Sequence, residues 1–247
     1  MVEGRHWLPG QDMADVAWKL VAVNLSDLAA KGAEPLGVLI GHTLGDGDAR
    51  FIEGLREVLE TYGVPLLGGD TVGGHGARTL GCTALGRASH CPVPSRAGAQ
   101  PGDRVYVTGT LGLAMLGFEA LRDRTGADST AYRRPAPRLA EGRALAPIVT
   151  AMMDISDGLL LDAWRLAEAS GVTLAIDGND VPVADAARRR ECLSWGDDYE
   201  LLFTAPAGIA LPVEAHRVGA VETRGQTPLS LDGEPLRRAE GLGYQHS

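Results

Sequence analysis

The spacing of hydrophobic residues predicts alternating helices and strands in the first third of the chain. Residues 11–31 carry apolar side chains at helical spacing, and Gly32 follows as a C-terminal cap. A second, amphipathic helix is predicted over residues 47–62, ending at Gly63. Strands are expected at residues 35–44, 64–72 and 78–86.

A change in composition separates this region from a second region that also alternates strands and helices. Residues 91–102 are rich in Pro, Gly and Ser without periodicity, so we predict a linker there between domains at 1–90 and 103–247. Beyond it, strands are expected at 103–109, 150–155 and 171–176, and helices at 111–123, within 133–148 and at 159–170. Two α/β halves are the simplest account.

Composition and charge narrow the classes of function. With 247 residues, 45% of them hydrophobic and 22% charged, the chain is typical of a globular protein, and no apolar run is long enough to span a membrane. The N-terminus has no export signal, and three scattered cysteines form no disulfide or metal pattern, which favours the cytoplasm. A net charge of −9 argues against nucleic acid or anionic lipid as partners, so an anionic ligand would need bound cations.

Carboxylates interrupt two apolar elements of the first half. Asp27 lies on the same side of its helix as Leu20 and Val23, where a bare buried charge would cost several kcal/mol. Taken alone, Asp27 is better explained as a surface residue that points to water near the helix end. Asp70 follows two glycines at the end of a strand, which suits either a ligand site or a simple turn.

The segment MMDISDGLLL carries the strongest signal. If its helix begins at Ser156, that serine is the N-cap and Asp157 lies in the first turn, where the helix dipole favours an acid. This leaves Asp154 unexplained, and two carboxylates with a hydroxyl form a hard-oxygen site suited to Mg²⁺. Three more acids in WGDDYELLF (195–203) fit a solvated turn or a site about equally.

Six stretches, taken in order, resemble the thiamine-monophosphate kinase family: VEGRHW, NLSDLAAKGAEP, GGDT, SRAGAQPGDRVYVTGTLG, MDISDGLLLD and GDDYELLF. The resemblance runs from residue 2 to about residue 244. It implies a two-domain fold like that of aminoimidazole ribonucleotide synthetase, with mixed sheets. It also implies ATP-dependent conversion of thiamine monophosphate to thiamine diphosphate, and a homodimer that pairs the sheets of the N-terminal domains.

The resemblance also implies site residues, position by position. The implied Mg²⁺ ligands are Asp27, Asp70, Asp154 and Asp157. The implied ATP contacts are Gly69, Asp70, Arg96 and Ser156. The implied contacts to thiamine phosphate are His6, Asp197 and the C-terminal aromatic Tyr244.

Simple chemistry agrees with this allocation. Mg²⁺ held by aspartates would neutralise two phosphorylated anions. The acceptor is a phosphate monoester whose second pKa is about 6, so it is a dianion at neutral pH, and we expect no general base.

Two departures from the family pattern bear on activity. The family's G-G-E-D-Y-E-L has Trp195 in place of its first glycine here, and Asp197 in place of the longer glutamate. The family also carries Mg²⁺-binding aspartates ahead of V-E-G-x-H, whereas Met1 stands directly before that motif here, so the N-terminal domain is expected to be truncated. Two readings follow: an Mg²⁺-dependent kinase, or a catalytically impaired homologue that binds nucleotide or thiamine phosphate without efficient turnover.

Overall fold

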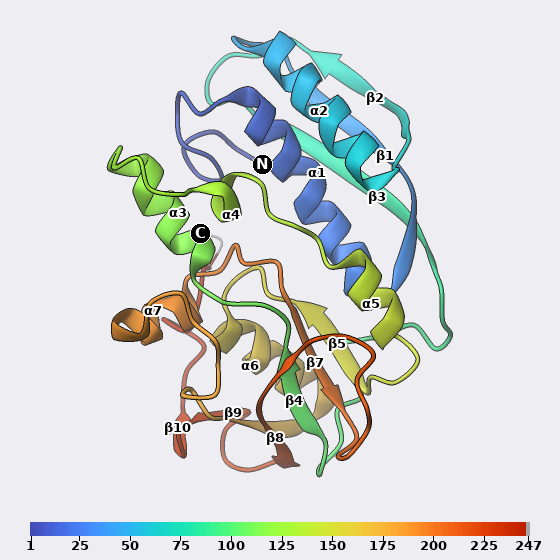
Figure 1. Cartoon of the computed structure of the whole chain (residues 1–247), viewed down its shortest axis with the longest axis vertical. Coiled ribbons are helices and arrows are strands. Elements are labelled where there is room, and N and C mark those ends of the chain that lie inside the picture. The colour runs from blue at the N-terminus through green and yellow to red at the C-terminus, as the bar shows by residue number, and fades with distance from the viewer. Residues whose placement is uncertain (246–247) are drawn as a thin grey trace.

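The computed structural model describes residues 1–245, which form two β-sheets with helices packed on and between them (Figure 1). The helices are α1 Met13–Ala29, α2 Asp48–Tyr62, α3 Leu113–Arg122, α4 Thr130–Arg133, α5 Leu139–Leu145, α6 Leu159–Ser170 and α7 Arg189–Ser194, with a 3₁₀ turn at Ala186–Arg188. The strands are β1 Ala33–Thr43, β2 Leu66–Val72, β3 Leu80–Ala88, β4 Arg104–Val107, β5 Ala151–Asp154, β6 Val172–Ile176, β7 Leu201–Ala205, β8 His216–Thr223, β9 Leu229–Leu231 and β10 Glu234–Leu236.

The first sheet has the order β2-β1-β3, with β1 parallel to β2 and antiparallel to β3. Helices α1 and α2 cover one face, where Val38 and Ile40 of β1 are buried. Leu39 lies between them in the strand and is 40% exposed, because alternate side chains point to opposite faces. Large apolar side chains of this sheet remain exposed at Leu36, Leu39, Leu66, Leu67, Val72 and Leu85. The face of the sheet opposite α1 and α2 is therefore an apolar surface exposed to solvent.

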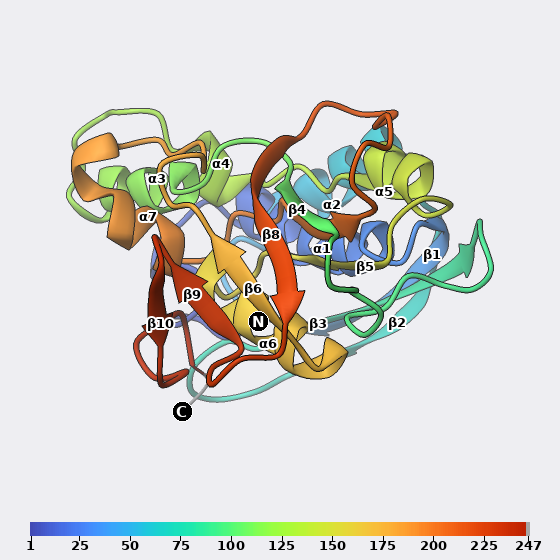
Figure 2. The ribbon, with the colours of Figure 1, turned by 90° about the horizontal axis from the view of Figure 1, so that it is seen from below.

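The second sheet has the order β10-β9-β6-β8-β4-β7-β5 (Figure 2). All its pairings are antiparallel except that of β6 with β9. The buried side chains of α6 pack against β4, β5, β6 and β7 in one apolar core. The sheets are mixed, as the fold class predicted from the sequence requires.

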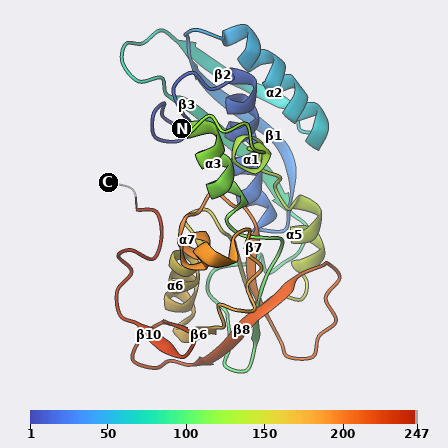
Figure 3. The same ribbon diagram turned by 60° about the vertical axis from the view of Figure 1, so that its left-hand side comes forward.

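In the described part of the chain, no strand is shared by the two sheets (Figure 3), but they share apolar packing through their side chains. The core beneath the first sheet also takes in Met152 of β5 and Phe203 of β7, together with Leu139 and Leu145 of α5. Residues 89–103, between β3 and β4, contain no helix or strand, and the Ser95 carbonyl accepts a hydrogen bond from the Met152 backbone N–H at 2.9 Å.

Local signals explain where the first helices begin and end. Asp12 caps α1 by accepting a hydrogen bond from the Ala14 N–H at 3.0 Å. Helix α2 ends at Gly63, which adopts φ 63° and ψ 34°, a left-handed conformation that favours glycine. Both helices and the strands around them are confirmed within a few residues. Among residues 1–245, no helix is long and apolar enough to cross a membrane.

Candidate functional site

The turn that follows β5 is held between two distant segments of the chain. The Asp197 N–H donates to the Ser156 carbonyl at 2.8 Å, and the Tyr244 N–H donates to the Asp157 carbonyl at 2.9 Å. A Cβ on Gly196 would lie 2.5 Å from the Ser156 carbonyl oxygen, so only glycine permits this approach. Four residues predicted from three separate motifs are thus brought together by backbone contacts.

The helix after this turn begins later than the sequence suggested, so the prediction that Ser156 is its N-cap is wrong. Helix α6 starts at Leu159, after Gly158, whose φ is 107°. The N-cap position is Gly158, which has no side chain to cap the helix. The fully buried Asp162 of α6 instead holds the preceding turn, because its Oδ2 accepts the N–H groups of Ser156 at 3.1 Å and Asp157 at 2.9 Å. Burial raises the pKa of Asp162 to about 7.

Asp157 already has a cationic partner. Arg165, two turns along α6, donates from Nη1 to Asp157 and also to Asp162, at 2.5 and 2.9 Å. The motif therefore places Asp157 in a three-residue network that fixes the turn. A metal ion at the Asp157 carboxylate would have to share it with Arg165.

Asp154 and Asp27 form the electrostatic centre of the site. Asp154 ends β5 and is 6% exposed, and it accepts a hydrogen bond at 2.8 Å from Ser26 Oγ of α1. Burial, and next the negative charge of Asp27, raise the pKa of Asp154 to about 6. Asp27 reaches solvent, but partial loss of hydration raises its pKa too. The fold therefore brings close together two predicted metal ligands, Asp27 and Asp154, that lie 127 positions apart in the sequence.

Two basic residues face this acidic pair. The charge of Arg96 lowers the pKa values of Asp27 and Asp154, and that of Lys31 lowers the pKa of Asp27, although burial prevails in both carboxyls. Lys31 follows Asp27 by four positions and was missed by the sequence reasoning, although a lysine one turn after a carboxylate signals such a pair.

The donor set at Asp27 and Asp154 fits an Mg²⁺ ion that also binds phosphates. No group of three or more His, Cys, Asp or Glu side chains suited to a metal occurs within residues 1–245. Mg²⁺ commonly uses only one or two carboxylates and takes its other ligands from water and substrate phosphates. Two carboxyls that each have a raised pKa near one another are a pair that such a cation would stabilise.

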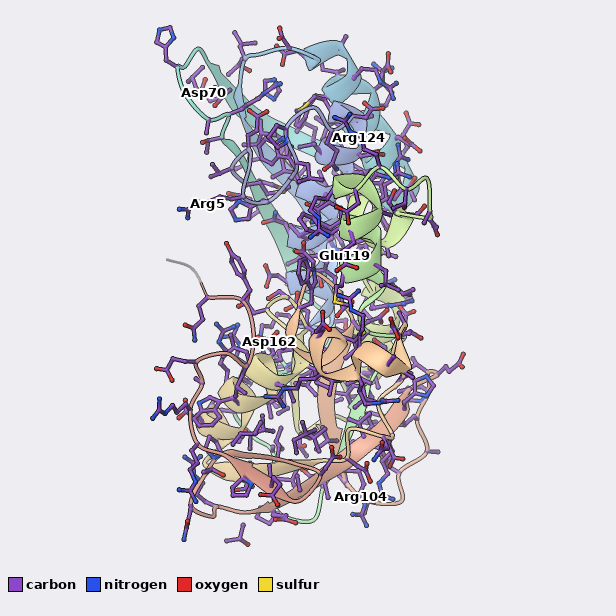
Figure 4. All side chains as sticks on the ribbon, turned by 90° about the vertical axis from the view of Figure 1, so that its left-hand side faces the viewer. Arg5, Asp70, Arg104, Glu119, Arg124 and Asp162 are labelled. Atoms are coloured by element: carbon purple, nitrogen blue, oxygen red, sulfur yellow. The ribbon has the colours of Figure 1, made fainter. Side chains whose placement is uncertain are left out.

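Gly69 and Asp70 lie away from this centre in the same chain. Asp70 pairs with Gly41 near the end of β1, whereas Asp27 lies near Ala33 at its beginning. Eight strand residues separate the two positions, which corresponds to about 25 Å at about 3.3 Å per residue. Figure 4 likewise shows Asp70 at one end of the molecule, far from Asp162, with Arg5 between them. One chain does not unite all four predicted metal ligands.

A cavity of about 560 Å³ opens beside the turn and contains the predicted substrate residues. His6, Asp197 and Tyr244 line it, and so do Ser156 and Asp157. The aromatic residues Phe118, Tyr132, Trp195 and Tyr199 form much of the remaining wall. The other two acids of the WGDDYELLF motif make structural contacts. Asp198 accepts the Gly112 N–H at 2.8 Å, and Glu200 forms an ion pair with Arg138.

A buried lysine anchors Asp197 beneath the cavity. Lys19 of α1 is 2% exposed, and its Nζ lies 2.7 Å from Asp197 Oδ2 and 3.8 Å from the centre of the Tyr132 ring. Tyr199 donates its hydroxyl to the other carboxylate oxygen of Asp197 at 2.9 Å. The sequence reasoning missed Lys19, although a lysine inside a helix of apolar residues was a visible signal.

Lys19→Met is expected to destabilise the fold by about 1–3 kcal/mol, because it leaves the partly buried Asp197 carboxylate without its cation. Urea unfolding at pH 7 measures the change. Arg50→Met is the matched control, since Arg50 pairs with Asp12 and Glu53 at the exposed surface, and little change is expected there. Equal effects of the two substitutions would contradict the anchoring role of Lys19.

Comparisons with known proteins agree with this arrangement. The AIR synthase related protein N-terminal domain matches residues 1–88, and the C-terminal domain of the same family matches residues 100–223. The thiamine-monophosphate kinase of Salmonella typhimurium is 40% identical over 271 residues, which cover 99% of this chain and 79% of the relative. That of Escherichia coli strain K12 is 38% identical over 279 residues, covering 100% and 84%.

Solved structures give the same result. A structure described as AaThiL complexed with AMPPCP and TMP superposes with a TM-score of 0.89 at 28% identity, covering 100% of this chain and 85% of that one. The thiamine-monophosphate kinase of Stenotrophomonas maltophilia superposes with a TM-score of 0.84 at 32% identity, covering 94% and 83%. The motifs, the fold and these relatives assign the chain to the thiamine-monophosphate kinases, a family of phosphotransferases built from AIR synthase related domains.

Proposed function

We propose that the chain transfers the γ-phosphoryl group of ATP to the phosphate of thiamine monophosphate, giving thiamine diphosphate and ADP. The observation that carries the proposal is the cavity beside residues 154–158, where the predicted substrate residues meet the turn that bears the predicted nucleotide and metal residues. The relative that binds AMPPCP and TMP together supports the pairing of these two substrates.

Asp27 and Asp154 would hold Mg²⁺ at the nucleotide end of the site. The ion, when bound, neutralises phosphate charge and supplies the cation that a protein of net charge −9 needs. Arg96 and Lys31 add fixed positive charge beside the same carboxylates. Ser156 lines the cavity, and its backbone N–H donates to Asp162.

The acceptor needs little chemical activation. Because its phosphate is a dianion at neutral pH, catalysis can rest on positioning and charge neutralisation rather than on a general base. Arg5 and His6 line the cavity and would bind the acceptor phosphate. His6 is oriented for this by the Val2 N–H, which donates to its Nδ1 at 2.9 Å.

The working unit that we propose is a homodimer that pairs the apolar faces of two N-terminal sheets. The exposed leucines of β1, β2 and β3 would be buried in that interface. An antiparallel face-to-face arrangement would place the Asp70 end of one sheet against the Asp27 end of the other. A second copy would therefore supply the carboxylate that lies out of reach within one chain.

Turnover of the purified chain tests the proposed activity. With ATP and Mg²⁺, thiamine monophosphate is expected to disappear as thiamine diphosphate forms, and chelation of Mg²⁺ is expected to stop the reaction. Binding of both ligands without product would instead identify an impaired homologue. A chain that binds neither ligand would contradict the proposal.

A further inference from the structure

One wall of the cavity is a row of aromatic rings that leads to Trp195. The Trp195 ring contacts Phe118 with 5.2 Å between ring centres and 42° between planes. Phe118 in turn meets Tyr132 edge to face at 5.3 Å. Trp195 lies directly after α7, at the cavity, and is 37% exposed. A large ring is thus fixed on one side by packing and open on the other.

Two neighbouring rings, those of Tyr132 and Phe118, already carry protein cations. Lys19 Nζ lies 3.8 Å above the Tyr132 ring, and the Arg122 guanidinium lies 5.6 Å from the centre of Phe118. Within residues 1–245, no lysine or arginine occupies the Trp195 ring. Tryptophan presents the most favourable aromatic face for a cation, so the available face is also the strongest one.

The carboxylates of the cavity are less suited to bind a ligand cation directly. Asp197 is paired with Lys19, Asp157 with Arg165, and Glu191 with Arg188. Each would have to give up a partner to bind a ligand cation. A flat cationic ring would instead be recognised through the aromatic surface, which costs no ion pair.

We propose that Trp195 is the specificity-determining surface for the cationic heteroaromatic ring of the substrate, which stacks on its open face with the phosphate directed to the Ser156 turn. The inference rests on the proposed function, since thiamine monophosphate carries such a ring in its thiazolium, with a permanent positive charge. The residue contributes to substrate binding and not to the transfer step.

Steady-state kinetics of Trp195→Leu and Trp195→Phe test this role. Trp195→Leu is expected to raise KM for thiamine monophosphate about tenfold or more, with kcat and KM for ATP within about threefold of wild type. Trp195→Phe, which keeps an aromatic face, is expected to stay within about threefold in all three constants. Tyr106→Leu is the matched control, since it breaks the stack of Tyr106 on Phe203 at 5.3 Å, away from the residues that line the cavity.

Binding without ATP separates this inference from the proposed function. Calorimetry with thiamine monophosphate should show the same tenfold loss in Trp195→Leu, whereas thiochrome monophosphate, an analogue whose planar ring system carries no charge, should lose about threefold or less. Circular dichroism and the melting temperature confirm that each variant is folded. Unchanged affinity of Trp195→Leu for thiamine monophosphate, or equal losses for both ligands, would overturn the role of Trp195. Absence of thiamine monophosphate binding by wild type would overturn the proposed function itself.

Discussion

Asp154→Asn is expected to remove Mg²⁺-dependent phosphoryl transfer while stabilising the folded chain in the absence of ligands. The carboxylate is 6% exposed and lies near Asp27, and both burial and this like charge make its ionised form unfavourable. An asparagine keeps an oxygen to accept the Ser26 hydroxyl and carries no charge. A loss of about 10²-fold or more in kcat is expected, since the substitution removes a proposed metal ligand.

The stability gain has a defined pH dependence. In the unfolded chain Asp154 ionises with a pKa of 3.8, whereas in the folded chain its pKa is raised to about 6. A raised carboxyl pKa means that ionisation costs folding stability, in full above the folded pKa and not at all below the unfolded one. A shift of about two pKa units corresponds to about 3 kcal/mol. The advantage of Asp154→Asn should therefore appear between pH 4 and 6 and persist above pH 6.

Urea unfolding at pH 4 and pH 8, with turnover assays at pH 8, measures both effects. With Mg²⁺ and ATP present, the wild type should become more stable than Asp154→Asn, because only the wild type is stabilised by binding them. Asp103→Asn is a matched control: Asp103 is also buried, but it accepts hydrogen bonds from Gln100 and Thr150 outside the site. A variant that loses stability at pH 8 and keeps its Mg²⁺-dependent turnover would make Asp154 a structural residue.

Local patterns predicted the parts of the fold that local forces determine. Helices α1 and α2 have apolar spacing, and a cap that the sequence displays ends α2 at Gly63. The strands β8, β9 and β10 were not predicted. In β9 and β10 the reason is length, because each has only three residues and gains its stability from neighbours in the sheet. Ser156 was predicted as a cap from its neighbours alone, whereas the helix begins after Gly158 and Asp162 accepts the Ser156 N–H from within it.

The residues of the site likewise fall into those that local motifs predicted and those that only distant contacts define. The motifs predicted Asp27 and Asp154, and the fold brings them to the same place through Ser26. Lys19 stood out as a lysine among apolar residues, but its partner Asp197 is 178 positions away, so no local pattern pairs them. The position of the Trp195 ring likewise depends on its contact with Phe118 of α3, a helix that lies far from Trp195 in the sequence. Contacts between distant segments decide these roles, and one sequence does not reveal them.

Mixing two inactive variants is expected to restore activity if the site combines Asp70 of one subunit with Asp154 of the other. Within one chain Asp70 lies about 25 Å along β1 from the Asp27 end, so each subunit alone lacks one carboxylate. A mixed dimer of Asp70→Asn and Asp154→Asn would have one site with both changes and one site with neither. With random pairing, half of the dimers are mixed, so about a quarter of wild-type activity should return.

The matched control is the mixture of Asp27→Asn with Asp154→Asn. These two residues lie in the same chain on either side of Ser26, so every site of a mixed dimer keeps one defect and no activity should return. Leu39→Lys, placed on the exposed face of the sheet, should convert dimers to monomers in sedimentation and prevent the rescue, because a charge cannot be buried there unpaired. Restoration in neither mixture would place the whole site in one chain. Restoration that survives Leu39→Lys would place the interface elsewhere, because the first sheet would then not be needed to bring Asp70 to its partner.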